Sequence, residues 1–355
     1  MKKTLIALAA LAATGAFAQS SVTLYGAVDA SFDHGAGNGQ TVNRMNNSDL
    51  GSSKLGFKGT EDLGGGLKAV FKLEGGLANN TGNGKASNSN NQSNGAPASL
   101  AGAQGLDFQR YSYVGIDGNF GSLHLGREYI YSFWYGEGTV DPFSTNGPAQ
   151  TTNLFYKLAG GALVATNASN MISYNSPNGP VQGGVQYIMG GNTTATATVG
   201  KSDGSGYSAF LKYNQGPLLI TGAVSKVDYM VAGAYKVTGL SAQYDVNAAA
   251  SLMYTYAKET QLANANTENM VAGSYTMGAT KWKASYTHAS RTGSNVGTAN
   301  QYGLGVDYAL SKRTKLYTTV AEVKNSGNGL FSTGAVGAAN NSKSGAFAAG
   351  VFTSF

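Results

Sequence analysis

The chain has 355 residues, a formal net charge of +6 and no cysteine, which excludes a disulfide framework, a thiolate metal site and a cysteine nucleophile. The mild positive charge argues against a nucleic-acid-binding protein, in which basic residues are far more concentrated. Charged residues make up only 12% of the chain, about half of the roughly 25% found in ordinary globular domains. Glycine and tyrosine are abundant, with 51 and 21 residues.

The N-terminus has the pattern of an export signal. Lys2 and Lys3 precede a short apolar run at 5–13, and Ala16-Phe17-Ala18 supplies the small residues of a cleavage site. The apolar run is about half of the roughly 20 residues that a membrane-spanning helix needs. We therefore predict a signal peptide at 1–18 that is removed, and a single domain at 19–355.

The rest of the chain alternates between apolar and polar residues with a period of two. Val22, Leu24 and Phe32 alternate with polar residues such as Asp29 and Asp33, and similar runs occur at 67–74, 207–213 and 301–308. No apolar run after residue 18 is long enough for a spanning helix, and within lipid only helices and closed barrels satisfy every backbone polar group. A β-sandwich would also alternate, but here the polar face carries several lysines. The pattern therefore predicts an all-β, transmembrane antiparallel barrel of about 16 strands.

The connections between the alternating runs differ in length. Short turns are expected at 62–66, 117–119, 215–217 and 310–313, and long connections at 35–49, 78–107, 128–168, 290–299 and 323–344. Short turns on one side and long loops on the other are typical of outer-membrane barrels.

Strand alternation also predicts which charged side chains face the lumen. The acids on that face are Asp29, Asp33, Glu74 and Asp307, and the basic residues are Lys54, Lys58, Lys68, Lys72, Arg110, Lys212, Lys281 and Lys283. Any one of these could simply be a charge that a water-filled channel tolerates. Together the basic excess favours a weak preference for anions, because a narrow pore focuses the field of its lining charges.

Four segments in order along the chain resemble a known family. The segments 21–26, 54–64, 113–127 and 308–314 are similar to strands and turns of Gram-negative general diffusion porins of the neisserial and β-proteobacterial type. The resemblance implies a homotrimer in the outer membrane whose water-filled channel passes ions and small hydrophilic solutes. It also implies that the third extracellular loop folds inward, that lipids and lipopolysaccharide surround the barrel, and that the barrel-assembly machinery inserts it.

The same resemblance assigns the charges that narrow the pore. Lys54 and Arg127 occupy the positions of basic wall residues, while Glu137 and Asp141 belong to the inward loop. A third wall arginine is expected within 165–174, but that segment contains no Arg or Lys, and Thr166 and Asn167 stand in its place.

The position of Arg127 conflicts with strict alternation. Alternation places Arg127 on the same side as Leu123 and Leu125, which is the lipid side. For Arg127 to reach the lumen, the strand must bulge or end near Gly126, a residue suited to either.

Phe355 ends the last alternating run and resembles the terminal aromatic residue by which the assembly machinery recognises its clients.

Two other classes of function remain open. An outer-membrane hydrolase would need a catalytic His, but His34, His124 and His288 lie in no recognisable catalytic motif. A surface adhesin or receptor would use the long loops. No cofactor motif and no metal-ligand spacing is found in the sequence.

Overall fold

The computed structural model describes residues 20–87, 91, 105–156, 158, 166–190, 200, 202–328, 331–337 and 339–355. The predicted signal peptide lies outside the described residues. No helix within these ranges is long and apolar enough to cross a membrane.

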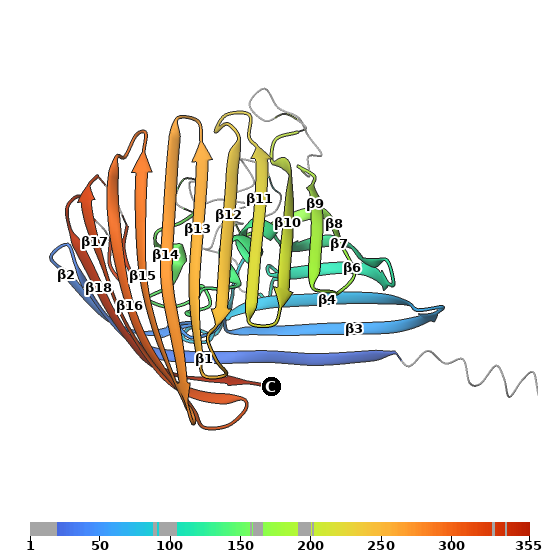
Figure 1. The fold of residues 1–355 in the computed structure, drawn as a ribbon, viewed down its shortest axis with the longest axis horizontal. Helices are drawn as coiled ribbons and strands as arrows, with labels where there is room; N and C mark the ends of the chain where they lie inside the picture. The colour runs from blue at the N-terminus through green and yellow to red at the C-terminus, as the bar shows by residue number, and fades with distance from the viewer. Residues whose placement is uncertain are drawn as a thin grey trace, which may run out of the picture.

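Sixteen antiparallel strands form a closed barrel, in which each strand pairs with the next and the last pairs with the first (Figure 1). The number agrees with the sequence-based prediction. Two short strands are not counted among the sixteen: β2 (Gln40–Asn47), which pairs with the end of β1, and β5 (Asn83–Gly84), which pairs with the end of β4. The barrel strands are β1 (Ser21–Gly37), β3 (Lys54–Gly64), β4 (Leu67–Ala78), β6 (Tyr111–Gly118), β7 (Gly121–Tyr129), β8 (Asn167–Asn175), β9 (Val181–Ile188), β10 (Ser205–Gln215), β11 (Leu218–Asp228), β12 (Tyr235–Asp245), β13 (Ala250–Gln261), β14 (Asn264–Met277), β15 (Thr280–Thr292), β16 (Gly297–Ala309), β17 (Thr314–Gly327) and β18 (Lys343–Ser354).

The alternation in sequence becomes an apolar outer face and a polar inner face. In β1, Val22 and Leu24 are 69% and 55% exposed on the outside, whereas Asp29 and Asp33 are buried on the inside. The other strands repeat this arrangement because successive side chains of a strand point to opposite faces. An exposed apolar band on the outside is the surface that a barrel presents to lipid.

The four predicted short turns are found, but several strands are longer than the sequence suggests. The connection expected at 35–49 is mostly the β1–β2 hairpin, and β15 and β16 extend into the one expected at 290–299. The connection expected at 323–344 is shortened at both ends by β17 and β18. The reason is physical: above the membrane neither face meets lipid, so the strands continue without apolar alternation.

In the third long connection, the described residues 130–156, 158 and 166 fold into the barrel, and we call them L3. L3 contains α2 (Tyr131–Phe133), η1 (Trp134–Gly138) and η2 (Thr151–Asn153), and in Figure 1 this green part of the chain lies on the inner side of the strand wall. Its apolar side chains pack against the wall, with Val140 against Met253 and Met270. The inward fold of the third loop is confirmed.

Hydrogen bonds tie both halves of L3 to the strands. The Ser132 N–H donates to Ser208 Oγ at 3.2 Å, and Ser241 Oγ donates to the Gly136 carbonyl at 2.7 Å. Further along, the Gln301 side-chain amide donates to the carbonyls of Ala149 and Gln150 at 3.1 and 3.0 Å. L3 therefore narrows the lumen as a fixed part of the wall.

The chain ends meet where the barrel closes. The Phe355 N–H donates to the Gly26 carbonyl at 3.0 Å, and the Gly26 N–H donates to the Phe355 carbonyl at 3.1 Å. The Phe355 ring covers Gly26 so closely that a Cβ there would lie 2.5 Å from the ring. Phe355 thus extends the pairing of β18 with β1 by one residue.

Candidate functional site

A lumenal cavity of about 570 Å³ lies between L3 and the barrel wall. On the L3 side it is lined by Phe133, Trp134, Pro142, Ser144, Thr145 and Asn146. The charged side chains around it come from the wall, and five of those six are basic: Lys54, Arg110, Lys281, Lys283, Lys315 and Asp307. The lining is therefore strongly unbalanced towards positive charge.

A buried glutamate organises part of this basic wall. Glu74 accepts a hydrogen bond from Arg110 Nε at 2.5 Å, and its Oε2 lies 3.8 Å from Lys54 Nζ and 3.9 Å from Lys72 Nζ. The Tyr25 hydroxyl also donates to Glu74 at 2.8 Å. One carboxylate thus faces three cations, so the cluster keeps an excess of positive charge while its side chains are held in place.

The only acid in the described lining is already paired. Asp307 Oδ1 lies 2.8 Å from Lys283 Nζ, and this ammonium group lies 5.0 Å from the centre of the Phe143 ring. Within the described residues no ion pair involves Lys281 or Lys315. Both lie next to the short-turn ends of their strands, so uncompensated positive charge extends along the lumen towards that end.

The two acids of the inward loop do not face this wall. Asp141 is buried within L3, where it accepts hydrogen bonds from the N–H groups of Phe143 and Thr145 at 2.8 and 3.0 Å and from Thr151 Oγ1 at 3.1 Å. Glu137 is fully buried in η1. Neither lines the cavity. We expected these loop acids to lie opposite the wall bases, and the structure corrects this. Asp141 instead holds the turn of L3 together, and the side chain of Glu137 is buried on the side of L3 away from the cavity.

The expected irregularity near Gly126 is present, but Arg127 does not reach the lumen. The pairing of β7 with β8 shifts between Gly126 and Glu128, and Gly126 has φ of +144°. The Arg127 guanidinium donates to the Gln109 carbonyl at 2.5 Å and to Ser169 Oγ at 2.7 Å. It lines a different cavity, of about 450 Å³. The extra residue of this irregularity lies in β8, which has two residues between the two pairs where β7 has only Arg127. Arg127 therefore keeps the outward side of Leu123 and Leu125, and Arg110 lines the lumenal cavity in its stead.

Two further lysines predicted to face the lumen lie over tyrosine rings. Lys72 Nζ lies 3.4 Å from the centre of the Tyr111 ring, and Lys58 Nζ lies 5.6 Å from that of Tyr25. An ammonium group over an aromatic face is attracted by the electron density of the ring. These contacts hold both lysines close to the wall.

The remaining two lysines of the prediction lie nearer the short turns. Lys68 stands at the second position of β4, on the same face of the strand as Lys72 and Glu74. Lys212 of β10 lines a separate cavity of about 580 Å³ beside the short turns. Neither of them lines the cavity next to L3.

Two features of the lining were uncertain or missed in the sequence. Thr166 and Asn167, which stand where a third basic residue is expected, do line the cavity. Lys315 also lines it and was not predicted. The alternation of the sequence could have predicted this position, because Lys315 precedes the outward Leu316 and shares a face with the buried Tyr317.

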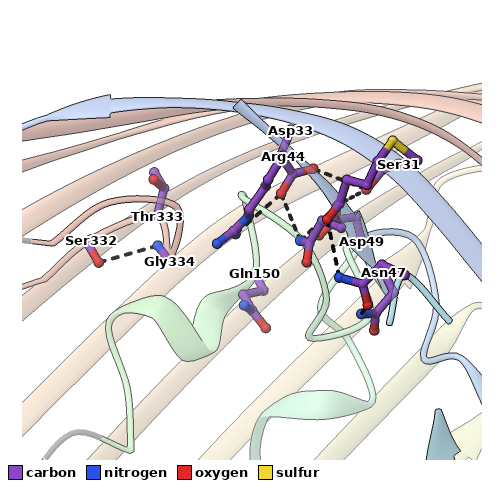
Figure 2. A network of polar contacts seen from close by, with 12 residues as sticks. Ser31, Asp33, Arg44, Asn47, Asp49, Gln150, Ser332, Thr333 and Gly334 are labelled. Atoms are coloured by element: carbon purple, nitrogen blue, oxygen red, sulfur yellow. Dashed lines mark hydrogen bonds and ion pairs between the residues drawn. The ribbon is translucent and has the colours of Figure 1, made fainter. Parts of the chain in front are cut away.

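A second polar network lies at the long-loop side of the barrel, between β1, β2 and L3 (Figure 2). Asn46 Nδ2 donates to Asp33 at 2.8 Å and to Asp49 at 3.0 Å, and Ser31 Oγ donates to both carboxylates. Arg44 lies 3.4 Å from Asp33. This network borders a cavity of about 260 Å³ that Asn146 and Gln150 of L3 also line.

The closed barrel, its apolar outer band and its polar lumen define a channel protein of the outer membrane. A family model described as Gram-negative porin matches residues 4–328. The chain is 32% identical to outer membrane porin protein 32 of Delftia acidovorans over 345 residues, which cover 92% of this chain and 90% of that protein. It is 29% identical over 338 residues to the major outer membrane protein P.IB of Neisseria meningitidis, covering 88% and 91% of the two chains.

Among solved structures, the anion-selective porin from Comamonas acidovorans superposes with a TM-score of 0.78 at 27% identity, covering 95% of this chain and 100% of that one. The chain belongs to the Gram-negative porin family. It is an outer-membrane porin of the neisserial and β-proteobacterial type, and its lumen serves the passive diffusion of solutes.

Proposed function

We propose that this porin passes small anions in preference to cations, and that the basic wall of the lumen produces the preference. The observation that carries the proposal is the charge of the cavity lining: five basic side chains against one acid, which is itself paired with Lys283. The solved neighbour described as anion-selective supports the same direction.

The mechanism is electrostatic attraction in a narrow, poorly screened space. L3 brings its uncharged side chains opposite the wall, so an ion in the cavity passes close to Lys54, Arg110 and Lys283. Low-dielectric walls focus the field of such charges on the pore. A free-energy difference of only about 0.5 kcal/mol between an anion and a cation changes their permeability ratio roughly twofold, because 1.4 kcal/mol corresponds to tenfold.

We also propose how this protein is exported, inserted into the membrane and assembled. The chain forms a homotrimer, surrounded by outer-membrane lipids and lipopolysaccharide, after removal of residues 1–18 and insertion by the barrel-assembly machinery. The exposed apolar band, which includes Val22, Leu24 and Leu211, supports the contact with lipid and with neighbouring subunits. The terminal position of Phe355 in the pairing of β18 with β1 supports its role in insertion.

Solute uptake into liposomes tests the proposed preference. Liposomes that contain the purified protein should swell faster in a singly charged anionic solute than in a cationic solute of equal size. Faster uptake of the cation would contradict the proposal, and no swelling in any small solute would contradict diffusion through the lumen.

A further inference from the structure

A tryptophan of L3 is exposed inside the barrel. Trp134 lines the lumenal cavity, and 43% of its surface is exposed. Among the described residues that line this cavity, it is the one large apolar side chain that is exposed to such an extent. The outward apolar side chains of the strands meet lipid, but Trp134 faces the space through which solutes pass.

Trp134 belongs to a group of three aromatic rings. Its ring centre lies 5.6 Å from that of Tyr129, which in turn lies 5.5 Å from that of Phe133 in a nearly parallel stack. All three residues line the cavity. Phe133 is buried and Tyr129 is half-buried, so Trp134 presents the open aromatic surface of the group. An apolar surface that is bordered by polar groups typically marks a binding site.

A basic group lies against the same rings. The guanidinium carbon of Arg110 lies 5.3 Å from the centre of the Tyr129 ring, and its Nε donates to Glu74. The two terminal nitrogens donate to no other described residue and are not among the buried atoms that lack a partner, so they are open to the lumen. The free edge of a guanidinium group binds a carboxylate through two parallel hydrogen bonds.

The cavity therefore joins an excess of positive charge to an aromatic surface. Its volume of about 570 Å³ falls in the range of roughly 300–1,000 Å³ that is usual for small-molecule sites. Because Arg110 and Trp134 lie beside the same Tyr129 ring, a solute whose carboxylate is attached directly to a flat ring reaches both. An aliphatic acid would use the charge alone, and a neutral aromatic solute would use the rings alone.

We propose that the lumenal cavity is a subsite for small aromatic carboxylates, with the carboxylate on Arg110 and the ring against Trp134. This inference rests on the proposed preference for anions and names the class of anion that gains most from it. A contact between aromatic rings contributes roughly two- to tenfold in affinity. Such weak binding raises uptake from dilute solution, because conduction needs a site that favours entry and still permits exit.

Block of the chloride current by added solutes tests the subsite. At neutral pH, benzoate should halve the single-channel current in KCl at a concentration about two- to tenfold below that of cyclohexanecarboxylate. The two solutes have the same charge and the same number of carbon atoms, but only benzoate is aromatic. Benzamide, which has the ring without the charge, should need a higher concentration than either.

The chain offers a matched control because it contains two tryptophans. Trp134→Leu should raise the half-blocking concentration of benzoate by about two- to tenfold, close to that of cyclohexanecarboxylate. Trp282→Leu makes the same change at an outward residue of β15 that is 51% exposed, and it should leave both concentrations unchanged. Arg110→Lys keeps the charge but loses the two-pronged contact, so it should raise both concentrations by the same factor.

Fluorescence gives a second measurement that leaves L3 unaltered. In Trp282→Phe, Trp134 is the only tryptophan, and 4-nitrobenzoate should quench its emission on binding beside it. Excess benzoate should displace the quencher and restore the emission. The same concentration of cyclohexanecarboxylate should restore less.

Four results would overturn the subsite. They are equal half-blocking concentrations of benzoate and cyclohexanecarboxylate, a block by benzamide as strong as that by benzoate, the same benzoate block in Trp134→Leu as in Trp282→Leu, and quenching of Trp134 that benzoate does not relieve. If the zero-current potential in a KCl gradient still has the sign of chloride preference, the proposed function survives any of these results. A potential with the sign of potassium preference would overturn the proposed function and the subsite together.

Discussion

Among the basic residues of the lumen, Lys281 and Lys315 have no ion-pair partner in the described structure, so their charge can be reversed without stranding a buried acid. Lys281→Glu and Lys315→Glu should each shift the zero-current potential in a salt gradient towards cations. The expected change in permeability ratio is about twofold, for an energy of roughly 0.5 kcal/mol.

Two control variants carry the same change in charge. Arg127→Glu alters a residue outside the lumenal cavity, and Lys343→Glu alters an exposed residue at the start of β18. Both should shift the potential much less. Equal shifts in all four variants would mean that the overall surface potential, and not the lining, sets the selectivity.

Asp49 provides a test of stability against pH. Burial, together with the neighbouring Asp33, raises the pKa of Asp49 to about 8. A carboxyl group whose pKa is higher in the folded state stabilises the fold below its unfolded pKa of about 3.9, and this contribution is lost as the pH rises towards 8.

The free energy of unfolding should therefore fall in that window, by up to about 1.4 kcal/mol per pH unit from this group. Asp49→Asn should reduce the slope. Denaturant unfolding of the refolded barrel at pH 5 and pH 8.5 measures it, and an unchanged slope in the variant would refute the assignment to Asp49.

At the scale of single elements, strand side chains could be predicted and loop side chains could not. A period of two directly fixes the face of Lys54, Lys72 and Lys283, because each strand has one side towards lipid. Alternation also places Arg127 outside with Leu123 and Leu125, as the structure has it, because the extra residue of the irregularity near Gly126 lies in β8. The expectation that Arg127 lines the lumen came from the family resemblance alone. L3 has no period at all, so the directions of Glu137 and Asp141 depend on its tertiary packing.

At one point the backbone of L3 lies directly against the backbone of the wall. A Cβ added at Gly239 of β12 would lie 2.5 Å from Gly136 Cα. Gly239→Ala should therefore push L3 away from β12 and towards the lumen, which lowers the single-channel conductance.

The matched control is Gly222→Ala on the neighbouring strand β11, where an added Cβ comes no closer than 3.8 Å to another group. Its conductance should equal that of the wild type. Normal conductance in Gly239→Ala would show that L3 is free to adjust there, against the close packing seen in the structure.

At the scale of the whole molecule, the barrel depends on the joint between its first and last strands. Deleting Phe355 removes both backbone hydrogen bonds to Gly26 and the ring that covers it. We expect a lower yield of heat-resistant, folded barrel in outer membranes at an unchanged rate of synthesis. Phe355→Tyr, which keeps an aromatic ring and the backbone pairing, should restore the yield. Equal amounts of folded barrel with and without Phe355 would count against its role in assembly.

The sign of the ion selectivity of the wild-type channel tests the account most directly. The lining joins five basic residues to one paired acid, so the net field in the lumen is positive. With purified protein in a planar bilayer and a tenfold gradient of KCl, the zero-current potential should have the sign of a channel that prefers chloride, and high salt should reduce the preference through screening. A potential of the opposite sign, showing a preference for potassium, would contradict the account.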